Sequence, residues 1–228
     1  MSDRPNHGPL GILMLDTRFP RIVGDVGNAA SYDFPVIFRT MQGIGPGDAV
    51  AAHPDRPRVL AALKANAEAL AAEGAVGLGT SCGFLALYQE DLAAVSPVPV
   101  ATSALLHIRT LAGRKAGVIT ASGKNLTPAH FAAVGAPVDT PVVGLPEDSS
   151  FAGTFLRNGT TLDREAVERE VVAAGRDLVA RHPEVDTLVL ECTNLPPYKA
   201  ALKAALGLPV YDVLDLLNRF HATLGQRR

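Results

Sequence analysis

Residues 75–88 read AVGLGTSCGFLALY and residues 185–198 read VDTLVLECTNLPPY. Each stretch begins with a short aliphatic run typical of a buried strand, places a cysteine after it, and continues into a helical pattern. Aligned on their cysteines, the two stretches match at Leu78/Leu188, Cys82/Cys192, Leu85/Leu195 and Tyr88/Tyr198. The two cysteines lie about half the chain apart, which is the spacing that a duplicated α/β unit predicts.

The same alternation of aliphatic run, polar turn and helical stretch extends over the whole chain. Strands are expected over residues 10–15, 75–79, 99–102, 115–120, 138–143, 187–191 and 209–213. Helices are expected over residues 57–73, 84–94, 103–112, 127–134, 163–181, 197–206 and 214–224. The expected strands are continuously apolar, which indicates parallel sheets buried on both faces. We therefore predict an α/β fold of two pseudo-symmetric lobes, each a small parallel β-sheet flanked by helices, with the active site between the lobes.

The predicted first lobe comprises residues 1–104 together with 213–228, where the C-terminal helix returns, and the second lobe comprises residues 105–212. Two stretches, 17–48 and 144–161, fit no regular element and are rich in Gly, Pro, Asn and Asp. Such long irregular segments are usually active-site loops or lids, and a missed strand or helix is the alternative.

The composition is that of a soluble globular protein, with 228 residues of which 47% are hydrophobic and 19% charged. The net charge is −2, so we expect neither nucleic acid nor a membrane as a partner. Two cysteines cannot fill a tetrahedral zinc site, and the six histidines show no close pair at ligand spacing, so no metal is expected. The start of the sequence does not resemble a signal peptide, which predicts a cytoplasmic protein with reduced thiols.

Both cysteines are expected at the carboxyl end of a strand, where ligands bind in α/β sheets. A helix N-terminus at the same place favours a thiolate, so the position predicts a lowered thiol pKa. Two facing thiols suit one reaction in particular: one takes a proton from a carbon and the other returns a proton to its opposite face. The flanking groups that could stabilise the resulting carbanion are Thr80, Ser81, Gly83, Thr193 and Asn194. The alternative is that each cysteine is an ordinary buried residue.

Three short motifs of the sequence resemble those of a known family. Leu190-Glu191-Cys192-Thr193-Asn194-Leu195-Pro196 is similar to the aliphatic-x-Cys-Thr motif of the aspartate/glutamate racemase superfamily, a group of cofactor-independent racemases and isomerases. Leu13-Met14-Leu15-Asp16-Thr17 looks like the Asp-Ser or Asp-Thr pair that ends the first strand of its members. Residues 117–123 resemble the polar turn that opens the second half, so the resemblance spans roughly residues 10–215.

The resemblance implies roles for particular residues. Cys82 and Cys192 would form the acid/base pair, and Asp16 and Thr17 would orient or polarise Cys82 and the substrate. The implied carboxylate site consists of Ser81, Gly83, Thr120, Ser122, Thr193 and Asn194. The resemblance further implies no cofactor and a small-molecule carboxylate as the substrate, and a homodimer is one alternative for the oligomeric state.

We therefore predict an isomerase, namely a cofactor-independent racemase of an amino acid or a related α-substituted carboxylate. Glutamate racemases usually carry Asn-Thr after the first cysteine and His after Cys-Thr, whereas this chain has Gly83-Phe84 and Asn194, which argues against glutamate. Arylmalonate decarboxylases resemble the chain only at the second cysteine, so Cys82 argues against them. The alternatives are a maleate-type cis-trans isomerase, a hydantoin racemase and a non-catalytic carboxylate-binding protein.

Overall fold

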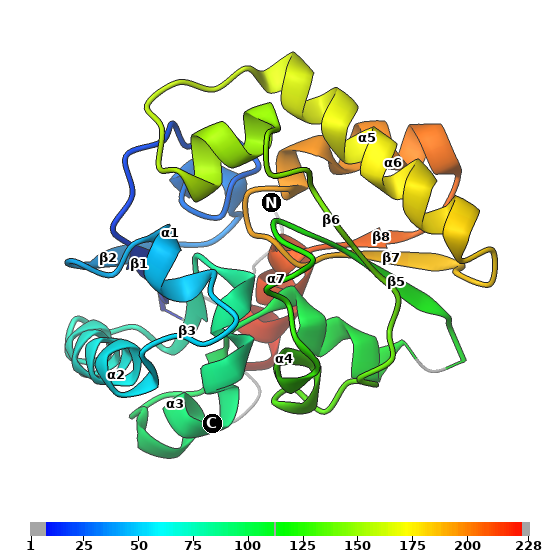
Figure 1. Cartoon of the computed structure of the whole chain (residues 1–228). Helices are drawn as coiled ribbons and strands as arrows, with labels where there is room; N and C mark the ends of the chain where they lie inside the picture. The colour runs from blue at the N-terminus through cyan, green and yellow to red at the C-terminus, as the bar shows by residue number, and fades with distance from the viewer. Residues whose placement is uncertain (1–7, 112, 225–228) are drawn as a thin grey trace, which may run out of the picture.

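The computed structural model describes residues 8–111 and 113–224, and it contains two parallel four-stranded sheets (Figure 1). The first sheet has the spatial order β2 (Val36–Met41), β1 (Leu10–Leu15), β3 (Gly77–Thr80) and β4 (Val100–Ala101). The second has the order β6 (Val142–Gly144), β5 (Ala116–Thr120), β7 (Thr187–Leu190) and β8 (Val210–Tyr211). The two sheets repeat one strand order, and the predicted α/β fold of two pseudo-symmetric halves is confirmed.

The central strands β1, β3, β5 and β7 carry the site. All six residues of β1 and all four of β7 are buried, as the continuous apolar runs predict. Leu13 of β1 pairs with Thr80 of β3, and Ile119 of β5 pairs with Leu190 of β7, so each central pair ends at nearly the same level. Strand order reverses between β1 and β3 and again between β5 and β7, and such switch points are where open α/β sheets bind ligands.

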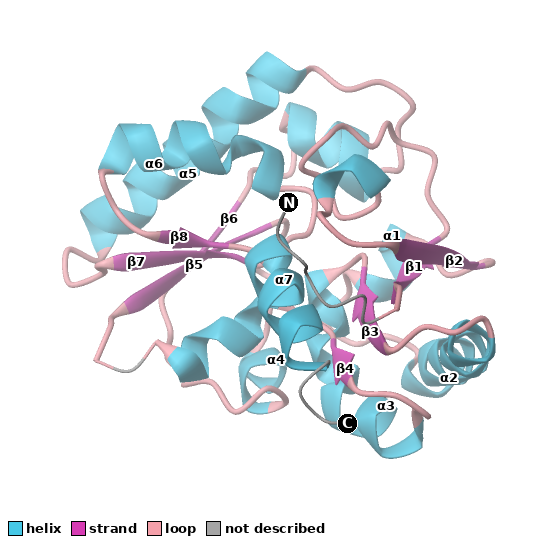
Figure 2. Ribbon diagram, turned by 180° about the vertical axis from the view of Figure 1, so that it is seen from behind, coloured by secondary structure: helices cyan, strands magenta, loops and turns pink. Residues whose placement is uncertain are grey.

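Helices flank both sheets (Figure 2). The first half contains α1 (Pro46–Ala49), α2 (Arg56–Ala72) and α3 (Gln89–Val95), and the second contains α4 (Pro128–Ala132), α5 (Arg164–Arg181) and α6 (Lys199–Leu206). The helix α5 begins where the Asp163 side chain accepts a hydrogen bond from the Ala166 N–H, and α6 ends at Gly207, whose φ is 67°. In the described part of the chain, no helix is long and apolar enough to cross a membrane.

The C-terminal helix α7 (Val213–Leu224) follows β8 of the second sheet but packs on β3 and β4 of the first. Gly77 and Gly79 leave room on β3 for this contact, because a Cβ on Gly79 would collide with Leu217 of α7 and one on Gly77 with Leu224. The boundaries of the two lobes, 1–104 plus 213–228 and 105–212, stay a prediction. Residues 1–7 and 225–228 of that first lobe lie outside the described residues.

Several predicted elements differ from those observed. The segment 17–48 is not irregular throughout, since it contains a 3₁₀ helix (Ala29–Ser31) and the edge strand β2. The helix expected over 84–94 is a 3₁₀ helix (Gly83–Tyr88) followed by α3, and the one expected over 103–112 is a 3₁₀ helix (Ala104–Thr110). Residue 112 lies outside the described residues. The segment 144–161 contains a single π-helical turn (Ala152–Leu156).

Candidate active site

The two cysteines line one small cavity at the point where the switch points of both sheets meet. Its wall is formed by residues that end β1, β3, β5 and β7, together with side chains from the two long connecting segments. The lining residues are Leu15, Thr17, Phe19, Pro46, Val50, Ser81, Cys82, Gly83, Phe84, Ala121, Phe155, Leu156, Cys192, Thr193 and Asn194, and none of them is charged. The cavity volume is about 20 Å³, which is room for about one water molecule. A substrate therefore requires part of this wall to move.

Cys82 lies in the turn between β3 and the 3₁₀ helix that begins at Gly83. Main-chain hydrogen bonds from Phe84 and Leu85 lower the pKa of its thiol, as the predicted position at a helix start requires. Burial and the neighbouring Glu191 outweigh them and raise the pKa of Cys82 to about 12. The prediction of a lowered thiol pKa is therefore wrong for Cys82. Burial removes the water that would stabilise a thiolate, and the two main-chain N–H groups do not fully replace it.

Cys192 occupies the equivalent turn after β7. Its thiol donates a hydrogen bond to Oδ1 of Asn194, with a sulfur–oxygen distance of 3.6 Å. Burial, followed by the charge of Glu191, raises the pKa of Cys192 well above the ordinary value, against one lowering main-chain hydrogen bond from Asn194. Both cysteines are free thiols.

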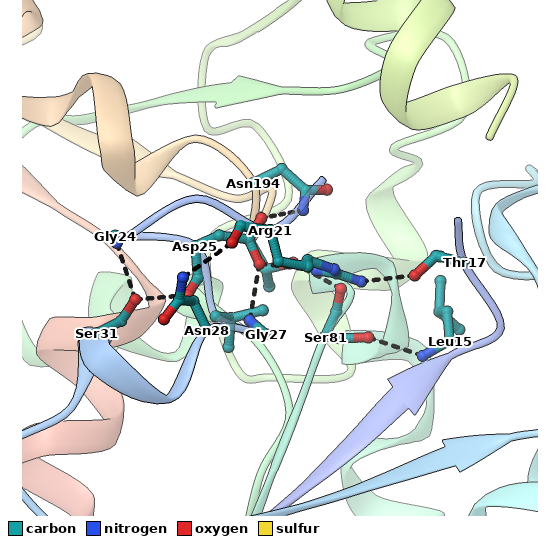
Figure 3. Close-up of polar contacts among 12 residues, drawn as sticks. Leu15, Thr17, Arg21, Gly24, Asp25, Gly27, Asn28, Ser31, Ser81 and Asn194 are labelled. Atoms are coloured by element: carbon teal, nitrogen blue, oxygen red, sulfur yellow. Dashed lines mark hydrogen bonds and ion pairs between the residues drawn. The ribbon is translucent and has the colours of Figure 1, made fainter. Parts of the chain in front are cut away.

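A buried chain of polar contacts holds Asn194 in place (Figure 3). The Asn194 Nδ2 donates to Oδ2 of Asp25 at 2.7 Å, and the Arg21 guanidinium donates to Oδ1 of the same carboxylate at 2.8 Å. Arg21 also donates to the Thr17 hydroxyl at 2.9 Å. The contacts thus link Cys192 in the second half to the segment after β1 in the first half.

The two cysteine turns are bonded directly to one another. The Thr193 hydroxyl donates to the main-chain oxygen of Ser81 at 2.6 Å, and the Ser81 hydroxyl accepts from the Leu15 N–H at 2.8 Å. These bonds fix the ends of β1, β3 and β7 relative to one another. They hold the two thiols at one cavity.

The structure brings together most, but not all, of the residues singled out in the sequence. Thr17, Ser81, Cys82, Gly83, Cys192, Thr193 and Asn194 line the cavity, whereas Asp16, Thr120 and Ser122 do not. Asp16 points away, because its Oδ2 accepts from the Gly43 N–H at 3.0 Å. Thr120 is fully buried and donates to Oε2 of Glu191 at 2.7 Å. Ser122 lines a separate surface hollow beside α1.

Other residues at the site are ones that the sequence alone does not place there. Asp25, Arg21 and Phe19 come from the segment 17–48, which has no periodicity to place them. Phe155 comes from the π-helical turn, and its ring lies 4.9 Å from that of Phe19, edge to face. Glu191 stands beside Cys192 in the quoted motif, but only the structure shows that its carboxyl group is fully buried.

Dimethylsulfoniopropionate lyase 5 of Emiliania huxleyi is 34% identical over 231 residues, which cover 93% of this chain and 45% of the lyase. A dimethylsulfoniopropionate lyase of Durusdinium sp. clade D is 30% identical over 91% of this chain and 72% of its own length. The chain therefore spans about half of the first relative and nearly three quarters of the second.

Solved structures show the same fold. Allantoin racemase from Klebsiella pneumoniae superposes with a TM-score of 0.67 at 15% sequence identity, covering 96% of this chain and 88% of the racemase. Residues 48–219, which include both cysteines, match the sequence profile described as Asp/Glu/hydantoin racemase. The chain belongs to the Asp/Glu/hydantoin racemase family.

Proposed function

We propose that this protein is a lyase in which a cysteine thiolate removes the proton from the carbon α to a carboxylate, and that its substrate is a β-sulfonium carboxylate of the dimethylsulfoniopropionate type. One observation carries the proposal: two thiols share a cavity whose lining contains three phenyl rings and no charged side chain among the described residues. The similarity to dimethylsulfoniopropionate lyases supports the same substrate.

The uncharged lining argues against an α-amino acid. An α-ammonium group enclosed here would need an anionic partner, yet Asp16 points away and Asp25 is already paired with Arg21. A sulfonium group spreads its charge over methyl groups, and aromatic faces bind such cations well. Phe19, Phe84 and Phe155 supply those rings.

A cationic substrate also explains how a buried thiol could ionise to the thiolate that acts as the base. Burial raises the pKa of both thiols and so favours their neutral form. A positive charge bound within a few ångströms favours the ionised form of an acid, and the effect is large where water is excluded. The sulfonium group of the bound substrate would therefore promote formation of the thiolate that removes the α-proton from that same substrate.

The proposed step is an elimination. The thiolate takes the α-proton, the C–H electron pair becomes the Cα=Cβ double bond, and the Cβ–S bond breaks with its electron pair leaving on dimethyl sulfide. The products are acrylate, dimethyl sulfide and a neutral thiol, which returns its proton to solvent. The Ser81 hydroxyl and the main-chain N–H groups of the two cysteine turns would stabilise the negative charge that develops on the carboxylate.

The test is to incubate the purified protein with dimethylsulfoniopropionate, measuring dimethyl sulfide in the headspace and acrylate by NMR. We expect both products, in equal amounts, and their loss in the Cys82→Ser, Cys192→Ser double variant. Elimination needs one base, so the single variants would differ: one abolishes turnover and the other retains part of it. A folded protein that releases no dimethyl sulfide would contradict the proposal.

A second candidate function, racemisation of an amino acid or a related α-substituted carboxylate, is favoured by one specific observation. A thiol stands at the same strand end in each half, and two-sided proton transfer requires both. Incubation in D₂O with L- and D-amino acids, 5-substituted hydantoins and maleate distinguishes the alternatives. Deuterium uptake with inversion, abolished by either single serine variant, would indicate a racemase. Conversion of maleate would indicate a cis-trans isomerase.

A further inference from the structure

Glu191 is a buried carboxyl group that the proposed reaction does not use. It follows β7, immediately precedes Cys192 and has no exposed surface. Its Oε2 accepts a hydrogen bond from Thr120 at 2.7 Å, while Oε1 has no hydrogen-bond partner among the described residues. A carboxylate sealed in this way is strongly disfavoured relative to the neutral acid.

The carboxyl group lies between the two cysteine turns. A Cβ atom placed on Gly83 would overlap both Oε1 and the main-chain oxygen of Glu191, so the residue after Cys82 packs directly on this side chain. A negative charge on Glu191 raises the thiol pKa of Cys82 and of Cys192. In the described structure neither carboxyl oxygen is hydrogen-bonded to a sulfur, so Glu191 is not placed to take a thiol proton directly.

The other charges near the site do not compensate for an anion at this position. Arg21 acts on Cys82 and Asp25 on Cys192, but the two are bound to each other as an ion pair at 2.8 Å. Burial raises the pKa of Glu191 to about 8, with the Thr120 hydrogen bond opposing the shift. Glu191, Cys82 and Cys192 are thus three buried acids without a cation of their own. Ionisation of one of them makes ionisation of the other two less favourable.

We propose that Glu191 is a positioning residue that favours a thiolate at Cys82 or Cys192 while its own side chain is an uncharged carboxylic acid and opposes that thiolate once it is ionised. The consequence for turnover rests on the proposed function, and it has a definite sign. Below pH about 8 the acid is neutral and does not oppose thiolate formation. Above that pH Glu191 ionises first, and each thiol then needs a still higher pH.

The experiment titrates the thiolate absorbance of the intact protein in the ultraviolet, without substrate. Its two cysteines are the only ones in the chain, so the signal reports them alone once tyrosinate absorbance is subtracted. Glu191→Gln keeps the shape of the side chain but carries no charge, so we expect the thiols to titrate about one pH unit lower. At a fixed alkaline pH the ratio of thiolate to thiol should then be roughly ten-fold higher. The exposed Glu165 on α5 provides the control, since Glu165→Gln leaves the titration unchanged. An unchanged or later titration in folded Glu191→Gln overturns the proposal.

A second variant keeps the test decisive if Glu191→Gln does not fold. Thr120→Val removes the hydrogen bond that lowers the pKa of Glu191, so the acid stays neutral to higher pH. Iodoacetamide should therefore alkylate the cysteines faster than in the unmodified protein about one pH unit above the pKa of Glu191, where Glu191 of the unmodified protein is mostly ionised, and an unchanged rate overturns the proposal. These experiments use no substrate, so they are independent of the assay for dimethyl sulfide. If the protein released no dimethyl sulfide, the proposed function would be refuted, but the effect of Glu191 on the thiols would still be tested. Where turnover is found, Glu191→Gln should extend activity to higher pH.

Discussion

Gly83, the residue after Cys82, has no room for a side chain. A Cβ there would overlap a main-chain oxygen of Glu191 as well as its carboxyl group, and the main chain after β7 cannot move aside because Glu191 N–H is bonded to Ile119. We expect Gly83→Ala to lower the free energy of unfolding by about 1–3 kcal/mol, the usual range for overpacking a rigid site. Urea denaturation followed by circular dichroism measures it.

The matched control is a glycine in open surroundings. Gly47 lies in α1, and a Cβ on it would meet no atom within 4 Å. Gly47→Ala should leave stability unchanged or raise it by up to about 1 kcal/mol, since alanine restricts the unfolded chain. Equal stability of the two variants would show that the contact between Gly83 and Glu191 yields easily, contrary to our interpretation.

Individual residues of the site could be predicted where chemistry follows from local sequence. Cys82 and Cys192 stand out because each ends an aliphatic run, and Thr193 and Asn194 are their chain neighbours. Asp25 could not be predicted, because its contact with Asn194 joins two halves of the chain and no periodicity leads to it. The direction of the thiol pKa shifts was also out of reach, since the sequence shows a helix start but not how completely water is excluded.

At the scale of elements, the strands that could be predicted are those buried on both faces. The edge strand β2 was missed because its residues are mostly only half-buried and include Arg39 and Thr40, so no apolar run marks it. Arg39 is paired with Glu73 at the end of α2, at 2.6 Å. A polar edge of this kind protects the sheet from pairing with other chains, and it hides the strand from a search for hydrophobic runs.

The two long connecting segments contact each other and both line the cavity, so we expect them to act as its cover. Besides the Phe19–Phe155 ring contact, Arg18 of the first segment donates from its main-chain N–H and its guanidinium to Asn158 of the second. We expect Arg18→Ala, which removes the guanidinium bond, to raise the rate at which iodoacetamide alkylates the cysteines. A loss of about 1 kcal/mol would increase the open population about five-fold.

Alkylation of each cysteine can be followed by mass spectrometry of its peptide at one pH. Arg181→Ala on α5 is the control, because Arg181 is exposed and pairs with Asp177 on its own helix. Its alkylation rate should match that of the unmodified protein. If Arg18→Ala also matched, the bond to Asn158 would have no part in closing the cavity, and opening would have to involve another part of the wall.

For the molecule as a whole, the repeated strand order gives physical meaning to the sparse identities between the halves. The matched residues Leu78/Leu188, Leu85/Leu195 and Tyr88/Tyr198 are all at most 1% exposed, so each pair occupies an equivalent buried position. The matched cysteines are the pair that reaches a cavity. The duplication thus places two copies of one ligand-binding strand end opposite each other, which a single sheet cannot do.

The helix α7 connects the two halves, and it provides a test of how independent they are. Leu217 is fully buried against β3 although α7 continues from β8 of the other sheet. We expect Leu217→Ala to lower the free energy of unfolding by about 2–5 kcal/mol. Because Thr193 and Gly83 also join the halves at the site, amide protection in β1 and β3 should fall together with that in β5 and β7.

Hydrogen exchange measured by mass spectrometry reports both sheets in one experiment. The control is Asn218→Ala, an exposed neighbour on the same helix, which should change stability by less than about 0.5 kcal/mol. Loss of protection confined to β1 and β3 would mean that residues 1–104 with 213–228 unfold apart from 105–212. The two thiols would then share a cavity only while the first lobe is folded, and Leu217→Ala would reduce turnover in proportion to that loss. Parallel loss in both sheets would instead mean that the cavity and the fold form one cooperative unit, because the contacts that bring the thiols together also hold the halves together.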